Sequence, residues 1–320
     1  MPLRFQLPLT HDAVWAFEAD GPAEDWLAEF ASAMGLSPGE GRADRHVHVE
    51  FMPRKPGEFF EPVLRRYAKA PTSGDWRIRE YPDQALFEHP EIREILCKVD
   101  LDVDGPKRSR QMRRALMPVY LEALKHGGLP LHGALIAVDG QGVILAGRSG
   151  AGKSTASRRL APSWRVLGDD LCLLVRAASG GYRGHPLPTW SDFAGAGETG
   201  VCRAGTSVPV RAVFFLEQSA EDQCVALPGS TTAISLAASA LEVFRSIDLG
   251  FPRRETADVK KAPYANAAAA AALIPSYLLR LSLTGRFWER IEQVLEKGDR
   301  PLYPSARLMS AGRLFMVAER

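Results

Sequence analysis

The 320-residue chain lacks several features that mark particular classes of protein. Its four cysteines, Cys97, Cys172, Cys202 and Cys224, show neither the C-x-x-C spacing of a zinc site nor a disulfide framework. The longest apolar run, 267–274, is too short to span a bilayer. The formal net charge of +2 argues against a general nucleic-acid or membrane-surface binder. We therefore expect a reduced, cytoplasmic protein with no nucleic-acid and no membrane partner.

The start of the chain also lacks the pattern of a secretory signal, because Arg4, His11 and Asp12 interrupt its apolar residues. Hydrophobic residues make up 46% of the chain and charged residues 24%, which is ordinary for a globular protein. The length exceeds that of a typical single domain, and 103–106 has the composition of a boundary. We predict a small α/β domain over 1–105 that recognises a partner or peptide, followed by a second domain over 106–320.

Two patterns stand out in the first domain. Apolar residues over 15–34 recur with helical spacing, which predicts a helix. Residues 45–51 alternate polar and apolar, which predicts a half-buried strand with His46 and His48 on one face. A metal pair is one interpretation of these histidines, but no third ligand is evident nearby. We favour polar positions on an exposed face.

The second domain begins with a basic segment. Residues 107–114 carry five lysines and arginines, apolar positions follow up to 124, and the pattern over 107–125 predicts a helix that is kinked at Pro118. The basic end suits either an acidic or phosphorylated partner or simple exposure to solvent. Arg253 and Arg254 lie in a loop-like stretch and also have two interpretations. They either stabilise charge on a transferring phosphoryl group or are simply exposed to solvent.

The most informative stretch is 147–155, which matches the phosphate-binding loop G-x-x-x-x-G-K-[ST] at every fixed position. Glycines let a backbone turn tightly and direct successive N–H groups at phosphate oxygens. The cofactor-binding residues predicted on this basis are Gly147, Ser149, Gly150, Ala151, Gly152, Lys153, Ser154 and Thr155. Lys153 would reach the β- and γ-phosphates, and the Ser154 hydroxyl would ligate Mg²⁺.

The context of this loop agrees with the motif. The apolar run 142–146 before it predicts a buried strand, and 155–160 after it predicts a helix whose N-terminal end faces the phosphates. The strand-like stretch 131–138 and the turn residues 139–142 make the loop's strand the second arm of an antiparallel hairpin. We conclude that the chain binds a nucleoside triphosphate, with ATP and GTP both open.

Asp169 and Asp170 follow Lys153 closely and stand at the end of another predicted strand. Nucleotide-bound Mg²⁺ needs a carboxylate beside the loop Ser/Thr, and a kinase needs a second carboxylate to accept the proton of the acceptor hydroxyl. Adjacent aspartates on a bent strand end can divide these two tasks. The alternative is a polar turn.

Together these residues resemble the P-loop fold of HPr kinase/phosphorylase and phosphoenolpyruvate carboxykinase. The shared features are His132-Gly133, the hairpin, the loop and the aspartate pair. The resemblance implies an α/β domain with a mixed sheet. It also implies that Asp169 is the catalytic base, that Asp170 lies on the Mg²⁺ side, and that His132 lies beside the pair and tunes Asp169. Arg148 stands where HPr kinases often have an acidic residue, and their glycine-rich signature after the aspartates is missing, which argues against HPr as substrate and against phosphorylase activity.

More closely, the chain resembles the ScmC group of the SynChlorMet cassette, whose relatives include kinases of a serine on lasso-peptide precursors. The resemblance covers about 110–300 and includes His185–Asp192, Ala212–Glu217, Ile274–Ser282 and Phe287-Trp288. It implies an ATP- and Mg²⁺-dependent kinase of a Ser or Thr hydroxyl on a ribosomally made precursor peptide or small protein. Catalysis would rest on Asp169, His132 and Lys153, with Ser154 and Asp170 holding the metal, and the oligomeric state stays open. A small-molecule alcohol kinase and a non-catalytic nucleotide-binding delivery protein also stay open.

Overall fold

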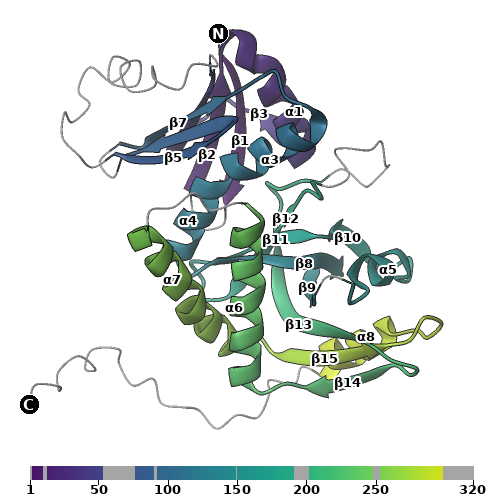
Figure 1. The fold of residues 1–320 in the computed structure, drawn as a ribbon. Helices are drawn as coiled ribbons and strands as arrows, with labels where there is room; N and C mark the ends of the chain where they lie inside the picture. The colour runs from purple at the N-terminus through teal and green to yellow at the C-terminus, as the bar shows by residue number, and fades with distance from the viewer. Residues whose placement is uncertain are drawn as a thin grey trace, which may run out of the picture.

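The structure, a computed structural model, describes residues 2–9, 13–52, 76–89, 92–148, 150–190, 202–247 and 253–297, without the side chains of 253–260 and 297. Two mixed β-sheets with helices packed on them make up this part of the chain (Figure 1). The α/β class expected from the sequence is therefore confirmed.

The first sheet belongs to the N-terminal region. In sheet order its strands are β3 (Ser37–Pro38), β1 (Leu3–Leu9), β2 (Ala13–Ala19), β4 (Arg45–Phe51), β7 (Glu94–Val99), β6 (Gln84–Glu88) and β5 (Arg77–Tyr81). β2, β4 and β7 run parallel to one another, and the other pairs are antiparallel. The predicted strand over 45–51 is confirmed as β4.

The predicted helix over 15–34 is wrong in its first half. Ala13–Ala19 is strand β2, and a 3₁₀ turn, η1 (Gly21–Ala23), separates it from helix α1 (Glu24–Met34). Trp15, Phe17 and Ala19, at alternate positions, join one core cluster, whereas Ala16 is buried outside that cluster, so the true period here is two and not 3.6. The Gly21-Pro22 pair then redirects the chain into α1.

Two short helices connect the sheets. They are α3 (Gly105–Ala115) and α4 (Met117–Lys125), and in Figure 1 they lie between the two sheets. Asp104 caps α3 by accepting a hydrogen bond from the backbone N–H of Lys107 at 3.0 Å. The single kinked helix predicted over 107–125 is therefore two helices, with Pro118 in the first turn of the second, where its missing N–H costs little.

The second sheet carries the glycine-rich loop. In order its strands are β10 (Arg165–Gly168), β8 (Leu129–Val138), β11 (Leu171–Arg176), β12 (Tyr182–Leu187), β13 (Val208–Gln218), β15 (Ser276–Leu281) and β14 (Gln223–Ala226), with β9 (Gln141–Ala146) paired to both β8 and β13. β13 runs parallel to β9 and β15, and the remaining pairs are antiparallel.

Helices cover both faces of this sheet. The helices of one face are α6 (Gly229–Ser246) and α7 (Arg253–Ala271), and those of the other are α5 (Lys153–Arg158) and α8 (Trp288–Lys297). Strand β9 shows the division: Ile144 joins the core cluster under α6 and α7, whereas Val143 and Leu145 join the cluster under α5 and α8. Burial on both faces explains why 142–146 is a continuous apolar run.

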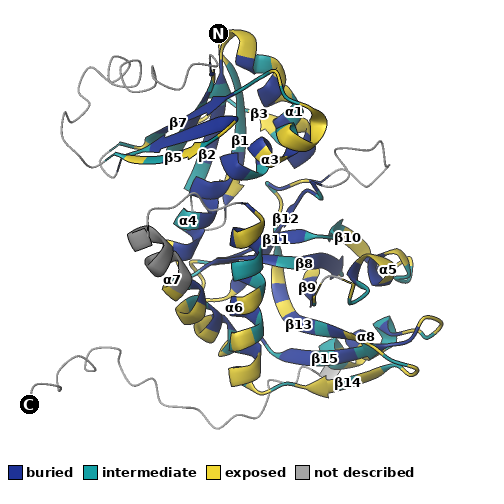
Figure 2. Ribbon diagram, viewed as in Figure 1, coloured by how far each residue is buried: buried dark blue, intermediate teal, exposed yellow. Residues whose placement is uncertain are grey.

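The larger core cluster is shared between the two sheets. It contains Phe17 and Val47 from the first sheet, Met112 from α3 and Leu135 from the second sheet (Figure 2, buried residues dark blue). Hydrogen bonds also cross the junction, for example from Trp26 Nε1 to Gln111 Oε1 at 3.0 Å. Among the described residues, no helix is both long enough and apolar enough to cross a membrane.

Candidate functional site

The site is built around the β8–β9 hairpin predicted from the sequence. Asp139 and Gly140 form its two-residue turn with φ of 48° and 73°, the left-handed pair that matches the twist of the flanking strands. β9 then ends at Ala146, the glycine-rich loop follows, and α5 begins at Lys153. The predicted order of strand, loop and helix is therefore present.

The loop backbone depends on glycine. Gly150 and Gly152 have φ of 80° and 100°, a conformation that other residues rarely adopt. Ala151 donates its N–H to Arg148 O at 3.0 Å, and Gln218 of β13 donates to Gly150 O at 2.8 Å, so the loop is tied to itself and to the sheet. Ser149, predicted as a cofactor ligand, lies outside the described residues.

Lys153 is folded back over this loop. Its Nζ donates to Gly147 O at 2.8 Å and to Arg148 O at 3.3 Å. Burial lowers the pKa of Lys153, while Asp170 and Glu242 act in the opposite direction. The ammonium group is thus held at the loop by weak carbonyl partners, in a place where a phosphate oxygen would be a stronger one.

Next to Lys153 lies a charged group contributed by three elements. His132 of β8 places Nε2 3.0 Å from Asp170 Oδ1 and Nδ1 3.1 Å from Glu242 Oε1, a residue of α6. Pairing of β11 with β8 sets Leu171 opposite His132, which brings Asp170 to the edge of β8. Ser239 of α6 holds the strand there by exchanging hydrogen bonds with the backbone N–H and C=O of His132.

These contacts shift two pKa values. The hydrogen bond to Asp170 raises the pKa of His132 despite burial and the charge of Lys153. Burial works against ionisation of Asp170, but His132, Lys153 and Arg113 together hold its pKa below the ordinary value. A doubly protonated His132 can present an N–H to each of the two carboxylates. Both pKa shifts therefore favour the ion pair of an ionised Asp170 and a protonated His132.

Asp169 has a different partner from the one expected. Thr189, just after β12, donates its hydroxyl hydrogen to Asp169 Oδ1. The expectation that His132 orients Asp169 is wrong, because the imidazole contacts Asp170 instead. The cause is the strand pairing, which turns the two adjacent aspartates toward different neighbours. The structure thus brings His132, Asp170 and Lys153 together. Asp169 is next to Asp170 in the chain but is hydrogen-bonded to Thr189.

The residues present fit a magnesium-bound nucleoside triphosphate. Ser154 and Thr155 are exposed in the first turn of α5, so their hydroxyls are accessible. A hydroxyl and a carboxylate are the oxygen donors that Mg²⁺ takes in such sites. A Cβ added to Gly150 meets nothing within 4 Å, so open space lies over the loop at this position. Ser154 and Asp170 would hold the ion, and the loop with Lys153 would hold the phosphates.

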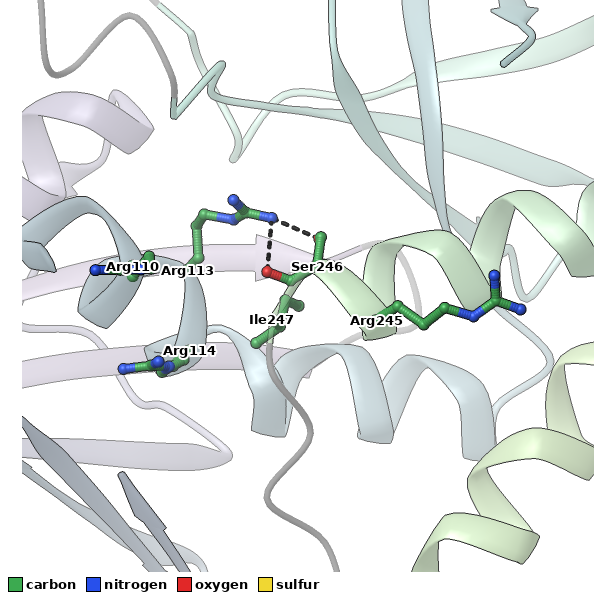
Figure 3. Close-up of a pocket in the computed structure, with 6 residues that line it drawn as sticks. All are labelled: Arg110, Arg113, Arg114, Arg245, Ser246 and Ile247. Carbon is green, nitrogen blue, oxygen red and sulfur yellow. Dashed lines mark hydrogen bonds between the residues drawn. The ribbon is translucent and has the colours of Figure 1, made fainter. Parts of the chain in front are cut away.

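A basic cavity of about 220 Å³ lies between α3 and the end of α6. Its lining consists of Arg110, Arg113 and Arg114 of α3 with Arg245, Ser246 and Ile247 from the end of α6 (Figure 3). Arg113 donates to the backbone O and to Oγ of Ser246. Arg110 and Arg245 lie on opposite sides of this contact (Figure 3). Because Arg113 also lowers the pKa of Asp170, the cavity and the carboxylate share one electrostatic environment.

The remaining candidates from the sequence have simpler places. Trp190 is buried and stacks on Phe30 with ring centroids 6.3 Å apart, which confirms its interpretation as packing. Arg253 and Arg254 begin α7 and not a loop, and their side chains lie outside the described residues.

Glu242, Ser239 and Thr189 are site residues that the sequence did not single out. Ser239 and Glu242 lie about one turn apart in α6, beside the buried residues Leu236 and Val243. The one sequence signal that could have identified them is this pair of polar residues at the border of an apolar helix face.

Two comparisons bear on the relationship of the chain to known proteins. Among curated proteins no match was found. The model of one protein family, described as SynChlorMet cassette protein ScmC, matches residues 95–296. This match spans more than half of the chain and includes the hairpin, the glycine-rich loop, the aspartate pair and α6. The chain therefore belongs to the ScmC family.

Proposed function

We propose that this chain is an ATP- and Mg²⁺-dependent kinase with a fold of the HPr kinase and phosphoenolpyruvate carboxykinase type, and that its acceptor is a Ser or Thr hydroxyl of a precursor peptide. The observation that carries the proposal is that Lys153, folded over a left-handed glycine loop, interacts with the charge of Asp170, and that the adjacent Asp169 has a different partner. Phosphoryl transfer needs little else than such positioning and charge.

The residues divide the work as follows. The loop backbone and Lys153 bind the phosphates, and bound Mg²⁺ would neutralise charge that develops on them. Ser154 and Asp170 would hold the ion, and His132 favours the ionised form of Asp170 and orients it through their hydrogen bond at 3.0 Å. Asp169, which is not engaged by that imidazole, accepts the proton of the attacking hydroxyl.

Two observations support a peptide as the acceptor. The basic cavity, whose Arg113 lowers the pKa of Asp170, suits an acidic or carboxylate-bearing segment, which a peptide offers. The N-terminal sheet shares a core with the kinase half and adds surface that a small alcohol does not need. A delivery protein without catalysis does not need Asp169 as a proton acceptor, whereas a kinase does.

The division between the aspartates is tested by measuring Mg-ATP binding and peptide-dependent ADP release in three matched variants. Asp170→Asn should weaken Mg-ATP binding, because it removes a metal ligand. Asp169→Asn should bind Mg-ATP nearly as wild type but release ADP about 100-fold or more slowly.

Asp139→Asn is the control, because it makes the same chemical change at the hairpin turn, where asparagine tolerates the left-handed φ of 48°. It should change neither readout. Exchanged results for Asp169 and Asp170 would make Asp170 the base, and full ADP release in both variants would refute the kinase proposal.

A further inference from the structure

The N-terminal sheet carries a cluster that is separate from the glycine-rich loop and lies outside the residues matched by the family model. It consists of Glu18 on β2 with His46 and His48 on β4. In the parallel pairing of these strands Glu18 stands opposite His48, and His46 lies two residues earlier on the same face. The missing third partner of the histidine pair is thus a glutamate from the neighbouring strand.

The donor atoms of the cluster converge. His46 Nδ1 is 3.0 Å from Glu18 Oε1, and His48 Nδ1 is 3.4 Å from Glu18 Oε2. The two imidazole rings are almost parallel, with an interplanar angle of 12° and centroids 6.1 Å apart. One donor atom from each residue can be chosen so that all three lie within 4.8 Å of one another.

These separations are close to those in a zinc site. Ligands about 2.05 Å from a tetrahedral Zn²⁺ stand about 3.3 Å apart, and each histidine Nδ1 is within a few tenths of an ångström of that distance from one of the two Glu18 oxygens. The side chains of His46, His48 and Glu18 are 27%, 16% and 15% exposed, so an ion can reach them from solvent. The opposite faces of the strands, with Phe17 and Val47, are buried and hold the backbone in place.

We propose that Glu18, His46 and His48 bind a divalent transition metal ion of the Zn²⁺ type, with a fourth position open to solvent. Two imidazoles and one carboxylate are a ligand set that zinc takes with a fourth position left for water, and they disfavour Mg²⁺, which prefers oxygen donors. His132 offers a contrast inside the same chain: its two carboxylate partners contact different ring nitrogens and therefore lie on opposite sides of the ring. They cannot converge on one ion as the Glu18 cluster does.

Arg4 is a competitor for the same carboxylate. Its Nε lies 3.0 Å from Glu18 Oε1, but without the alignment of a hydrogen bond, and its Nη2 donates to Gly41 O at 2.7 Å. A metal ion would have to displace this positive charge or share Glu18 with it. Removing the guanidinium should therefore strengthen metal binding, whereas a cluster that only makes hydrogen bonds would gain no affinity.

The test is Zn²⁺ titration of the purified full-length chain by calorimetry, with Co²⁺ absorption as a second readout. We expect one saturable site at micromolar or tighter affinity, and a Co²⁺ spectrum without the charge-transfer band of a cysteine thiolate. Affinity should fall at least about tenfold in Glu18→Gln and in the double variant His46→Gln, His48→Gln, and should rise in Arg4→Gln.

His126→Gln is the matched control, because His126 also contacts a glutamate, Glu122, but only at the exposed end of α4. Its zinc affinity should equal that of wild type. If the double histidine variant does not fold, Glu18→Gln and Arg4→Gln decide the question. A zinc affinity in Glu18→Gln equal to that of wild type, or no saturable binding in wild type, would overturn the proposal.

Discussion

Replacing Gly152 by alanine isolates the contribution of the loop backbone to nucleotide binding. Gly152 has a φ of 100°, and a Cβ built on it would meet Leu281 Cδ1 at 3.8 Å, an ordinary contact. The substitution is therefore strained by its backbone and not by a clash. A left-handed conformation costs an L-residue about 1–2 kcal/mol, and the loop can relieve this cost only by leaving the conformation that holds phosphates.

If that cost falls on binding, the Kd for Mg-ATP should rise about 5- to 30-fold, since about 1.4 kcal/mol corresponds to a factor of ten. Titration calorimetry of the full-length variant measures this change directly. Gly180→Ala is the matched control, because Gly180 has a φ of 92°, nothing within 4 Å of an added Cβ, and a place in the turn between β11 and β12. It should carry similar strain and leave the Kd unchanged. An unchanged Kd in Gly152→Ala would refute the reasoning.

Two further predictions concern stability. The His132–Asp170 pair stabilises the fold fully between pH 3.8 and 6.5, the ordinary pKa values of the two groups. Its contribution is lost as the pH falls through the lowered pKa of Asp170 or rises through the raised pKa of His132. The Tm difference between wild type and His132→Gln should therefore be largest inside that window. The pair contributes at most about 1 kcal/mol to the free energy of unfolding, because Asp170 is 38% exposed. A Tm difference that does not vary with pH would contradict this prediction. Gly35→Ala should cost about 2–4 kcal/mol in urea unfolding, because its φ is 58° and its Cβ would lie 1.8 Å from Cys202 O, whereas Gly21→Ala, with a φ of 60° and nothing nearby, should cost about 1 kcal/mol. Equal losses of stability in the two glycine variants would contradict this prediction, because they would mean that the backbone at Cys202 moves away from the added Cβ at little cost.

Features encoded by neighbouring residues were predictable from the sequence. The Asp139-Gly140 turn, the apolar run of β9 and the glycine loop each depend on residues within a few positions of one another, and each is present. The alternation over 45–51 likewise predicted β4 and the shared face of His46 and His48.

Features that depend on pairing between distant segments were not predictable. Glu18 joins the two histidines because β2 lies beside β4, and the sequence does not state which strands are neighbours. His132 contacts Asp170 instead of Asp169 because of the register between β8 and β11. The error over 15–34 has a local cause, because aromatic residues close together satisfy a helical and an alternating pattern at once. Only the structure shows that Trp15 and Phe17 share one face of a strand.

The most direct test of the central claim is intact-mass measurement of the precursor peptide encoded beside the gene, after incubation with the purified chain and Mg-ATP. The account predicts a gain of one phosphate mass on a Ser or Thr residue, lost in Asp169→Asn while Mg-ATP binding persists. Tight Mg-ATP binding without any gain of mass would contradict the peptide-kinase claim for that acceptor.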